Sequence, residues 1–170
     1  GPVVLGAAFA SDFPIVALHL TRPAVTIPDR DALGMASHFE AAKGAYLIRD
    51  WSVGKPKGGT VVVQGTMSTY NLFRALKDID AEGLNVRIVA AVSPQLFAAQ
   101  PAAYRESIFP AEAQMDCMAV SNRSRRLMYD WVKNPIAYEY SLTSDWDNRW
   151  RTGGSVDEVM AEAHLSPENI

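Results

Sequence analysis

The sequence predicts an α/β protein, a three-layer sandwich in which a mainly parallel, mixed sheet of about five strands lies between helices. Short apolar runs rich in β-branched residues alternate with helical stretches of ten or more residues, and this order builds parallel sheets that are covered on both faces. Residues 15–21 show almost no polar alternation, which is typical of strands buried on both faces, and residues 60–65 are a short β-branched run typical of a buried strand. Hydrophobic residues make up 48% of the chain and charged residues 21%, close to globular averages.

The first 36 residues differ from the rest. Residues 2–13 resemble the last turns of a helix, residues 15–21 predict a buried strand, and residues 22–39 form a connector interrupted by proline and glycine. One helix, one strand and a connector do not make a fold. We therefore assign residues 1–36 to the tail of another domain with its connector, and residues 37–170 to one α/β domain.

The α/β domain contains the remaining predicted elements. The predicted strands are residues 43–51, 60–65, 84–92, 114–122 and, less regularly, 137–142. The predicted helices are residues 66–83, two short pieces of 93–109 split by proline, residues 123–134, and a last helix from residue 155.

Two of these helices carry explicit signals. Residues 66–83 place an apolar stripe on one helical face and end at Gly83, a common stop. The members of that stripe are Tyr70, Phe73, Leu76 and Ile79. Ser155 is followed by Glu158 at the spacing of a capping box, which predicts a helix start there.

Composition excludes several classes of protein. A net charge of −3 argues against a nucleic-acid-binding domain, and no apolar run reaches the roughly 18 residues that a membrane helix needs. The single cysteine, Cys117, excludes an internal disulfide and suits the cytoplasm. It lies in a predicted strand between apolar residues, so a buried structural thiol is favoured over a nucleophile.

The sequence predicts no metal site and no catalytic residue in this chain. The three histidines, His19, His38 and His164, lack the spacing of metal ligands. Neither a dinucleotide-binding glycine motif nor a phosphate-binding Walker loop is present.

Gly65, Thr66 and Ser68 form a candidate anion-binding turn, because they lie where a buried strand enters a helix. Unpaired backbone N–H groups and the helix dipole favour anions at such a turn. The alternative is that Thr66 or Ser68 only caps the helix, and capping is favoured because every strand–helix turn needs a cap.

Arg22 is the second candidate, at the end of the predicted strand 15–21. Open α/β sheets bind ligands beyond the carboxyl ends of their strands, and a guanidinium matches phosphate or carboxylate. From its position alone, a solvated surface arginine is the favoured interpretation.

Two further groups allow either of two interpretations. Arg123, Arg125 and Arg126 open a predicted helix and form either a phosphate site or, as favoured, a solvated face. Trp146 and Trp150 lie among acidic residues and arginine, which suits a subunit contact or a cover over the core.

The chain resembles the C-terminal part of transketolases over residues 13–110, and more weakly to its end. The resemblance is carried by the ordered series FPIVALHLTRPAV, AAKGAYLI, GGTVVVQGTMSTYNLF and LNVRIVAAVSPQLF, closing at AAYRESIFP. Its order and spacing, rather than any single motif, match the family's strand ending in arginine, its KGGY-like segment and its glycine turn before a helix.

The resemblance implies a division of labour. Transketolases use thiamine diphosphate and Mg²⁺ to transfer a two-carbon ketol unit between phosphorylated sugars, and work as dimers. The residues that hold these cofactors belong to other domains, so this chain alone is expected to bind neither and to be inactive. Arg22 matches the family's arginine that holds the substrate phosphate, and the resemblance makes this role the favoured one.

The resulting hypothesis is a C-terminal section that serves packing and dimerisation in a transketolase-like parent enzyme. Its expected partners are the remaining transketolase domains or a second subunit, and a phosphorylated sugar substrate. The alternative is a free-standing α/β binding or regulatory module with an anion site at the Thr66 helix start.

Overall fold

The computed structural model describes all 170 residues and contains a five-stranded mixed sheet between two layers of helices. In chain order the elements are α1 (Pro2–Phe9), the 3-10 helix η1 (His38–Lys43), β1 (Ala45–Arg49), β2 (Thr60–Gln64), α2 (Thr66–Ala81), β3 (Arg87–Ala91), α3 (Pro94–Ala98), α4 (Ala102–Ile108), α5 (Ala111–Met115), β4 (Cys117–Ser121), the 3-10 helix η2 (Arg125–Met128), α6 (Pro135–Glu139), β5 (Leu142–Thr143) and α7 (Val156–Glu162).

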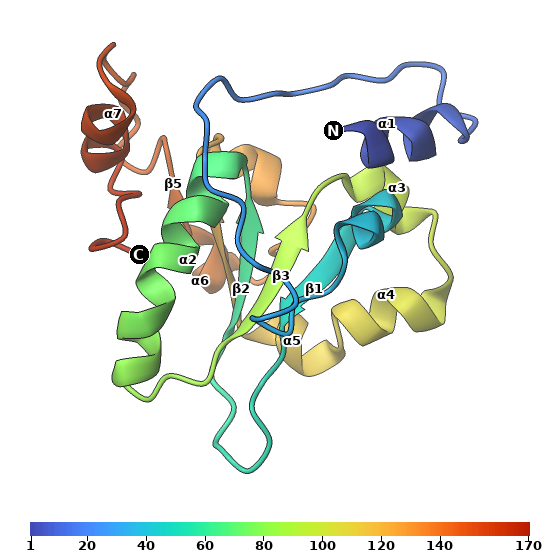
Figure 1. Ribbon diagram of the computed structural model, residues 1–170, viewed down its shortest axis with the longest axis horizontal. Helices are drawn as coiled ribbons and strands as arrows, with labels where there is room; N and C mark the ends of the chain where they lie inside the picture. Colours follow the sequence, from blue (N-terminus) through green and yellow to red (C-terminus); the bar gives the residue numbers. More distant parts are fainter.

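The strand order is β1-β3-β2-β4-β5. Strand β1 runs antiparallel to β3, and the four other strands run parallel to one another. The parallel strands therefore end at one common edge of the sheet (Figure 1). The predicted α/β class, mixed sheet and three layers are confirmed.

Side chains of successive strand residues bury into two separate cores, as the two-residue period of a strand requires. In β2, Val62 packs with Phe109 and Trp131 on one face, while Val63 packs with Leu72 of α2 on the other. Helices α2 and α7 cover this second face, and the chain around α4 and η2 covers the first (Figure 1).

Helix α2 is placed by more residues than the predicted stripe. Tyr70, Phe73, Leu76 and Ile79 are half-buried and pack against the second core, but the fully buried line lies beside them. That line consists of Met67, Ser68, Asn71, Leu72 and Ala75. The stop at Gly83, with φ of 74°, and the capping box of Ser155 and Glu158 at α7 are confirmed.

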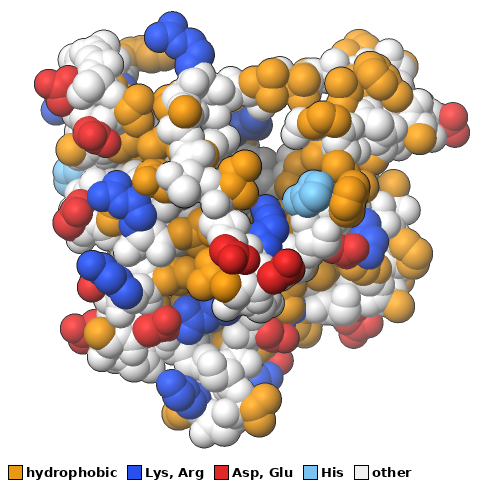
Figure 2. Space-filling view, in the orientation of Figure 1, with side chains coloured by type: hydrophobic (Ala, Val, Ile, Leu, Met, Phe, Trp, Pro, Cys, Tyr) orange, Lys and Arg blue, Asp and Glu red, His pale blue; other side chains and the backbone are white.

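The predicted strand at residues 15–21 is wrong. This segment is extended but pairs with no strand, and Ile15 and Leu20 are 84% and 73% exposed. A strand needs a neighbour that accepts its hydrogen bonds, and no strand of this chain lies beside it. It crosses the top of the molecule (Figure 1), and hydrophobic side chains lie at the surface around it and α1 (Figure 2).

The chain between β4 and β5 also differs from the prediction. Residues 123–134 form only the short η2 and turns, and residues 137–142 contain the end of α6 followed by the two-residue β5. The reason is the Asn134-Pro135 pair. Asn134 accepts a hydrogen bond from the Ile136 amide and Pro135 occupies the first helical position, so the pair starts a new helix directly after the helix predicted at residues 123–134. The short helix α5 was not predicted.

No helix combines the length and the apolar composition that crossing a bilayer requires.

Candidate functional site

The carboxyl edge of the parallel strands holds one of the two sequence-predicted sites. Beyond β2 the chain enters α2 and returns as β3 on one side of β2, and β4 then lies on the other side. Strand β2 is thus the point at which the order of the sheet reverses, which is where open α/β sheets bind ligands. Gly65 and Thr66 lie directly after it.

Gly65 has a backbone conformation that other residues rarely adopt, with φ of 99°. A Cβ atom added to it would lie 1.8 Å from Oδ1 of Asn122, the residue that follows β4. The absence of a side chain at Gly65 therefore lets the Asn122 amide lie directly against the turn.

The first turn of α2 is open. Gly65 occupies the N-cap position and no side chain caps the helix, so the predicted capping by Thr66 or Ser68 is wrong. The Thr69 hydroxyl instead donates a 2.8 Å hydrogen bond to the Gly65 carbonyl. Ser68 is fully buried and its Oγ has no hydrogen-bond partner. The amides of the first helical residues, which have no partner inside a helix, are left available.

The three clustered arginines have separate environments. Arg125 pairs with Glu139 at 2.9 Å and lies over the Tyr138 ring. Arg126 is exposed, and Arg123 is half-buried directly after Asn122. The side chains of Arg123 and Arg126 form no hydrogen bond or ion pair. The cluster is therefore not a single solvated face.

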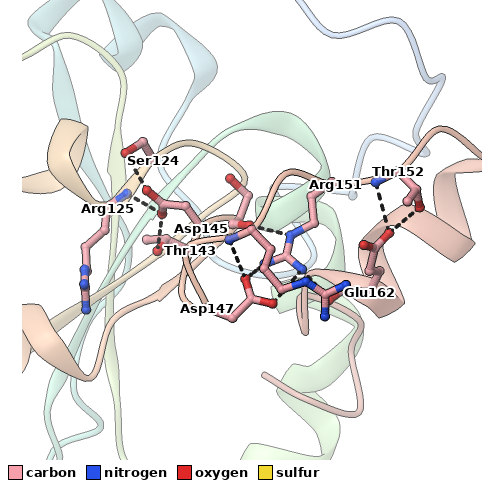
Figure 3. Close-up of polar contacts among 10 residues, drawn as sticks. Ser124, Arg125, Thr143, Asp145, Asp147, Arg151, Thr152 and Glu162 are labelled. Carbon is pink, nitrogen blue, oxygen red and sulfur yellow. Dashed lines mark hydrogen bonds and ion pairs between the residues drawn. The ribbon is translucent and has the colours of Figure 1, made fainter.

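Asp145 stabilises the loop that carries Arg123. Its carboxylate accepts hydrogen bonds from the Ser124 hydroxyl, the Arg125 amide and the Thr143 hydroxyl, at 2.6, 2.8 and 3.0 Å (Figure 3). Burial acts to raise the pKa of Asp145, but these hydrogen bonds outweigh it and the pKa is lowered. Because its acceptor atoms are occupied, Asp145 has a structural role.

A second cluster of polar residues stabilises the position of the C-terminal segment. Arg151 pairs with Asp147 and also donates to the Ser144 and Glu162 carbonyls at 2.6 and 3.1 Å (Figure 3). The Thr152 hydroxyl donates to the Glu162 carboxylate at 2.6 Å. These contacts hold α7 beside the end of β5 and form no open site.

Arg22, the other predicted site residue, is exposed. It forms no hydrogen bond or ion pair with another residue, and it follows the unpaired segment 15–21. The structure therefore does not join Arg22 to the Gly65 turn through any polar contact.

The remaining candidates are Cys117, the histidines and the two tryptophans, and their environments differ. Cys117 is 2% exposed, and burial together with the nearby Asp116 charge raises its pKa to about 11, so its thiol stays protonated at neutral pH. No three potential metal ligands lie together. Trp146 stacks on His164 with ring centroids 4.4 Å apart, whereas Trp150 is 97% exposed and does not cover the core.

Residues 44–141 match the transketolase-like TK C-terminal domain. The chain belongs to this family. The match begins at Gly44, directly before β1, and ends at Ser141, directly before β5, so it contains the Gly65 turn and Arg123.

Whole transketolases show the same relationship over part of their length. A transketolase from Nostoc sp. is 33% identical over 133 residues, which is 73% of this chain and 19% of that protein. Transketolase 1 from Vibrio vulnificus is 38% identical over 74 residues, or 43% of this chain and 10% of that protein. The chain spans about a fifth or less of the length of these relatives.

Solved transketolase structures share the fold. A mutant transketolase from Pichia stipitis in complex with fructose 6-phosphate superposes with a TM-score of 0.59 at 22% identity, covering 81% of this chain and 18% of that one. The transketolase from Leishmania mexicana gives a TM-score of 0.57 at 21% identity, covering 79% and 18%.

Asn122 was not among the predicted site residues of this transketolase C-terminal domain, and Arg123 was expected on a solvated face. A usable signal was present, because both residues follow a buried parallel strand, as the Gly65 turn does. Such positions meet at one edge of the sheet.

Proposed function

We propose that this chain is the C-terminal section of a transketolase-like enzyme that transfers a two-carbon ketol unit between phosphorylated sugars. The observation that carries the proposal is the match of residues 44–141 to the transketolase C-terminal domain. The Nostoc relative is about five times longer than the matched stretch, which covers 19% of it. We therefore assign thiamine diphosphate and Mg²⁺ to other domains, and infer that this section alone is inactive.

Residues 1–36 would form the tail of the pyrimidine-binding domain and its connector. Support comes from the segment 15–21, whose apolar side chains Ile15, Leu18 and Leu20 are 84%, 48% and 73% exposed. Exposure of such a run is unfavourable unless another surface covers it. We propose that the sheet of that preceding domain provides the cover, and that residues 37–170 serve domain packing in a cytoplasmic homodimer.

Reconstitution tests this assignment. The chain is assayed for ketol transfer from xylulose 5-phosphate with thiamine diphosphate and Mg²⁺, alone and after the remaining domains of the parent protein are supplied. Activity only in the reconstituted protein is the expected result. Turnover by the isolated chain, or tight binding of thiamine diphosphate by it, would refute the division of labour.

Arg22 is proposed to hold the phosphate of the sugar substrate in the assembled enzyme. Its guanidinium is exposed and has no partner in this chain, so it is free to accept one. Replacing Arg22 with alanine should raise KM for phosphorylated substrates about ten- to a hundredfold, since a hydrogen bond to a charged group contributes about 1.5–3 kcal/mol. Unphosphorylated substrates serve as the internal control, and an equal loss on both kinds would make Arg22 structural.

A free-standing binding module remains the second candidate function, because the uncapped start of α2 and the buried, unpaired Ser68 hydroxyl leave hydrogen-bonding groups unused. A natural start codon just before Val3 would favour this candidate. A long upstream reading frame in the parent gene would exclude it.

A further inference from the structure

Hydrogen-bond donors without partners gather where β2 and β4 end. Helix α2 is 16 residues long, has no side-chain cap and has no acidic residue in its first turn. The positive end of its dipole and the open amides of Thr66, Met67 and Ser68 therefore face this edge without compensation. An open helix start alone is common, so a second observation is needed.

That observation is a fully buried serine and a half-buried asparagine at the same turn, each with a buried oxygen that has no partner. Ser68 is fully buried, and its Oγ has no partner. Because side chains of a helix tilt toward its N-terminus, this hydroxyl is directed back toward the Gly65 turn. Asn122 lies against Gly65, and its Oδ1 is also buried without a partner. Buried polar atoms are nearly always hydrogen-bonded, so both side chains lack a hydrogen-bond partner that a bound ligand would provide.

Both side chains are able to donate. A hydroxyl rotates, and turning the Asn122 amide about its last bond exchanges its oxygen for its NH₂ group. The turn therefore offers neutral donors in addition to its backbone amides.

Arg123 supplies the charge. Gln64 pairs with Ser121 in the register of β2 and β4, so the Gly65 turn and the Asn122–Arg123 segment continue side by side beyond the ladder. The Arg123 guanidinium has no hydrogen bond or ion pair, whereas Arg125 and Arg151 pair with Glu139 and Asp147. The carboxylate of Asp145, which follows β5, already accepts three hydrogen bonds and does not pair with Arg123.

We propose that the Gly65–Ser68 turn, Asn122 and Arg123 bind a phosphate group, either as the free ion or as part of a phosphate ester. Backbone and side-chain donors lie at the adjoining ends of β2 and β4, and Arg123 adds a positive charge there, which suits a compact oxyanion that accepts many hydrogen bonds. The site lies where open α/β sheets bind ligands. It belongs to this chain alone, so it does not depend on the activity proposed for the parent enzyme.

The test is an NMR titration of the ¹⁵N-labelled chain with inorganic phosphate at constant pH and ionic strength, with chloride as the control anion. The amides of Thr66, Met67, Ser68 and Arg123 should shift in a saturable way with phosphate and not with chloride. Glycerol 3-phosphate, titrated in the same way, distinguishes the two sources: tighter binding than inorganic phosphate indicates an ester, and equal binding indicates the free ion.

Matched variants make the result specific. Arg123→Gln should weaken phosphate binding about tenfold or more, while Arg126→Gln, with the same change of charge at an exposed residue nearby, should change it less than about twofold. Ser68→Ala should also weaken binding if Arg123→Gln fails to fold. Absence of saturable shifts, meaning that water alone completes the turn, would overturn the proposal, as would equal losses in the two arginine variants.

Discussion

Replacement of Gly65 with alanine tests the close approach between the two strand ends. The backbone at Gly65, with φ of 99° and ψ of 146°, is strained for any residue with a Cβ, at a cost of about 1–3 kcal/mol. The new Cβ would also lie 1.8 Å from Asn122 Oδ1, and forcing such an atom into a packed site costs about another 1–3 kcal/mol. We therefore expect Gly65→Ala to lower the free energy of unfolding by about 2–6 kcal/mol.

Gly83 provides the matched control. Its φ is also positive, at 74°, but a Cβ there meets nothing within 4 Å. Gly83→Ala should thus cost only the backbone strain, about 1–2 kcal/mol. Urea unfolding at equilibrium measures both variants, because the free energy is obtained by linear extrapolation. Adding Asn122→Ala to Gly65→Ala should remove the clash. The free energy lost by the double variant should therefore be smaller than the sum of the losses of the two single variants in a double-mutant cycle.

Two outcomes would refute this reasoning. A Gly65→Ala loss no larger than that of Gly83→Ala would mean that Asn122 does not lie against the turn. A double variant no more stable than Gly65→Ala alone would mean that the loss comes from the backbone and not from the contact with Asn122.

Two further predictions follow from buried groups. The Arg87 side chain is 4% exposed, pairs with the 55% exposed Asp50 and donates to the Ser107 and Ile108 carbonyls at 2.6 and 3.1 Å. Arg87→Met leaves these carbonyls unpaired and should cost about 1–3 kcal/mol in urea unfolding. Arg49→Met, which breaks the exposed pair with Asp80, should cost less than about 1 kcal/mol, and equal costs would contradict the role of burial. Burial and Asp116 raise the folded pKa of Cys117 to about 11, so its stabilising contribution is complete below the unfolded pKa of about 8.5 and is lost as pH rises toward 11. Unfolding curves from pH 7 to 10 should show a decline that Cys117→Ala lacks, and an identical decline in both proteins would exclude this thiol as its cause.

The sequence predicted the buried strands correctly where a β-branched run finds neighbouring strands within the same chain. Residues 60–65 and 15–21 carry equally apolar patterns, yet only the first forms a strand, between β3 and β4. The pattern reports a preference for burial, not the presence of a partner. The strand expected at residues 137–142 was wrong for another reason, because the Asn134-Pro135 pair starts α6 there and leaves only the two-residue β5.

Only part of the site was predicted, because one of its residues depends on a contact between strands that are far apart in the sequence. Gly65 marks a strand–helix turn that is legible in the sequence, but Asn122 lies 57 residues later. Their contact depends on the pairing of β2 with β4, and no local sequence pattern predicts that pairing. Thr66 and Ser68 do not cap α2 because Gly65, which has no side chain, occupies the N-cap position and both residues lie inside the first turn.

The strand order also has a consequence for the order in which the chain folds during synthesis. Strand β2 lies between β3 and β4, so after residue 91 has emerged one of its edges stays unpaired until residues 117–121 arrive. An unpaired edge of a central, apolar strand is prone to join another chain. The helices α3, α4 and α5 are made during that interval, and we expect the nascent chain to be most vulnerable to aggregation, and most dependent on chaperones, while they are being added.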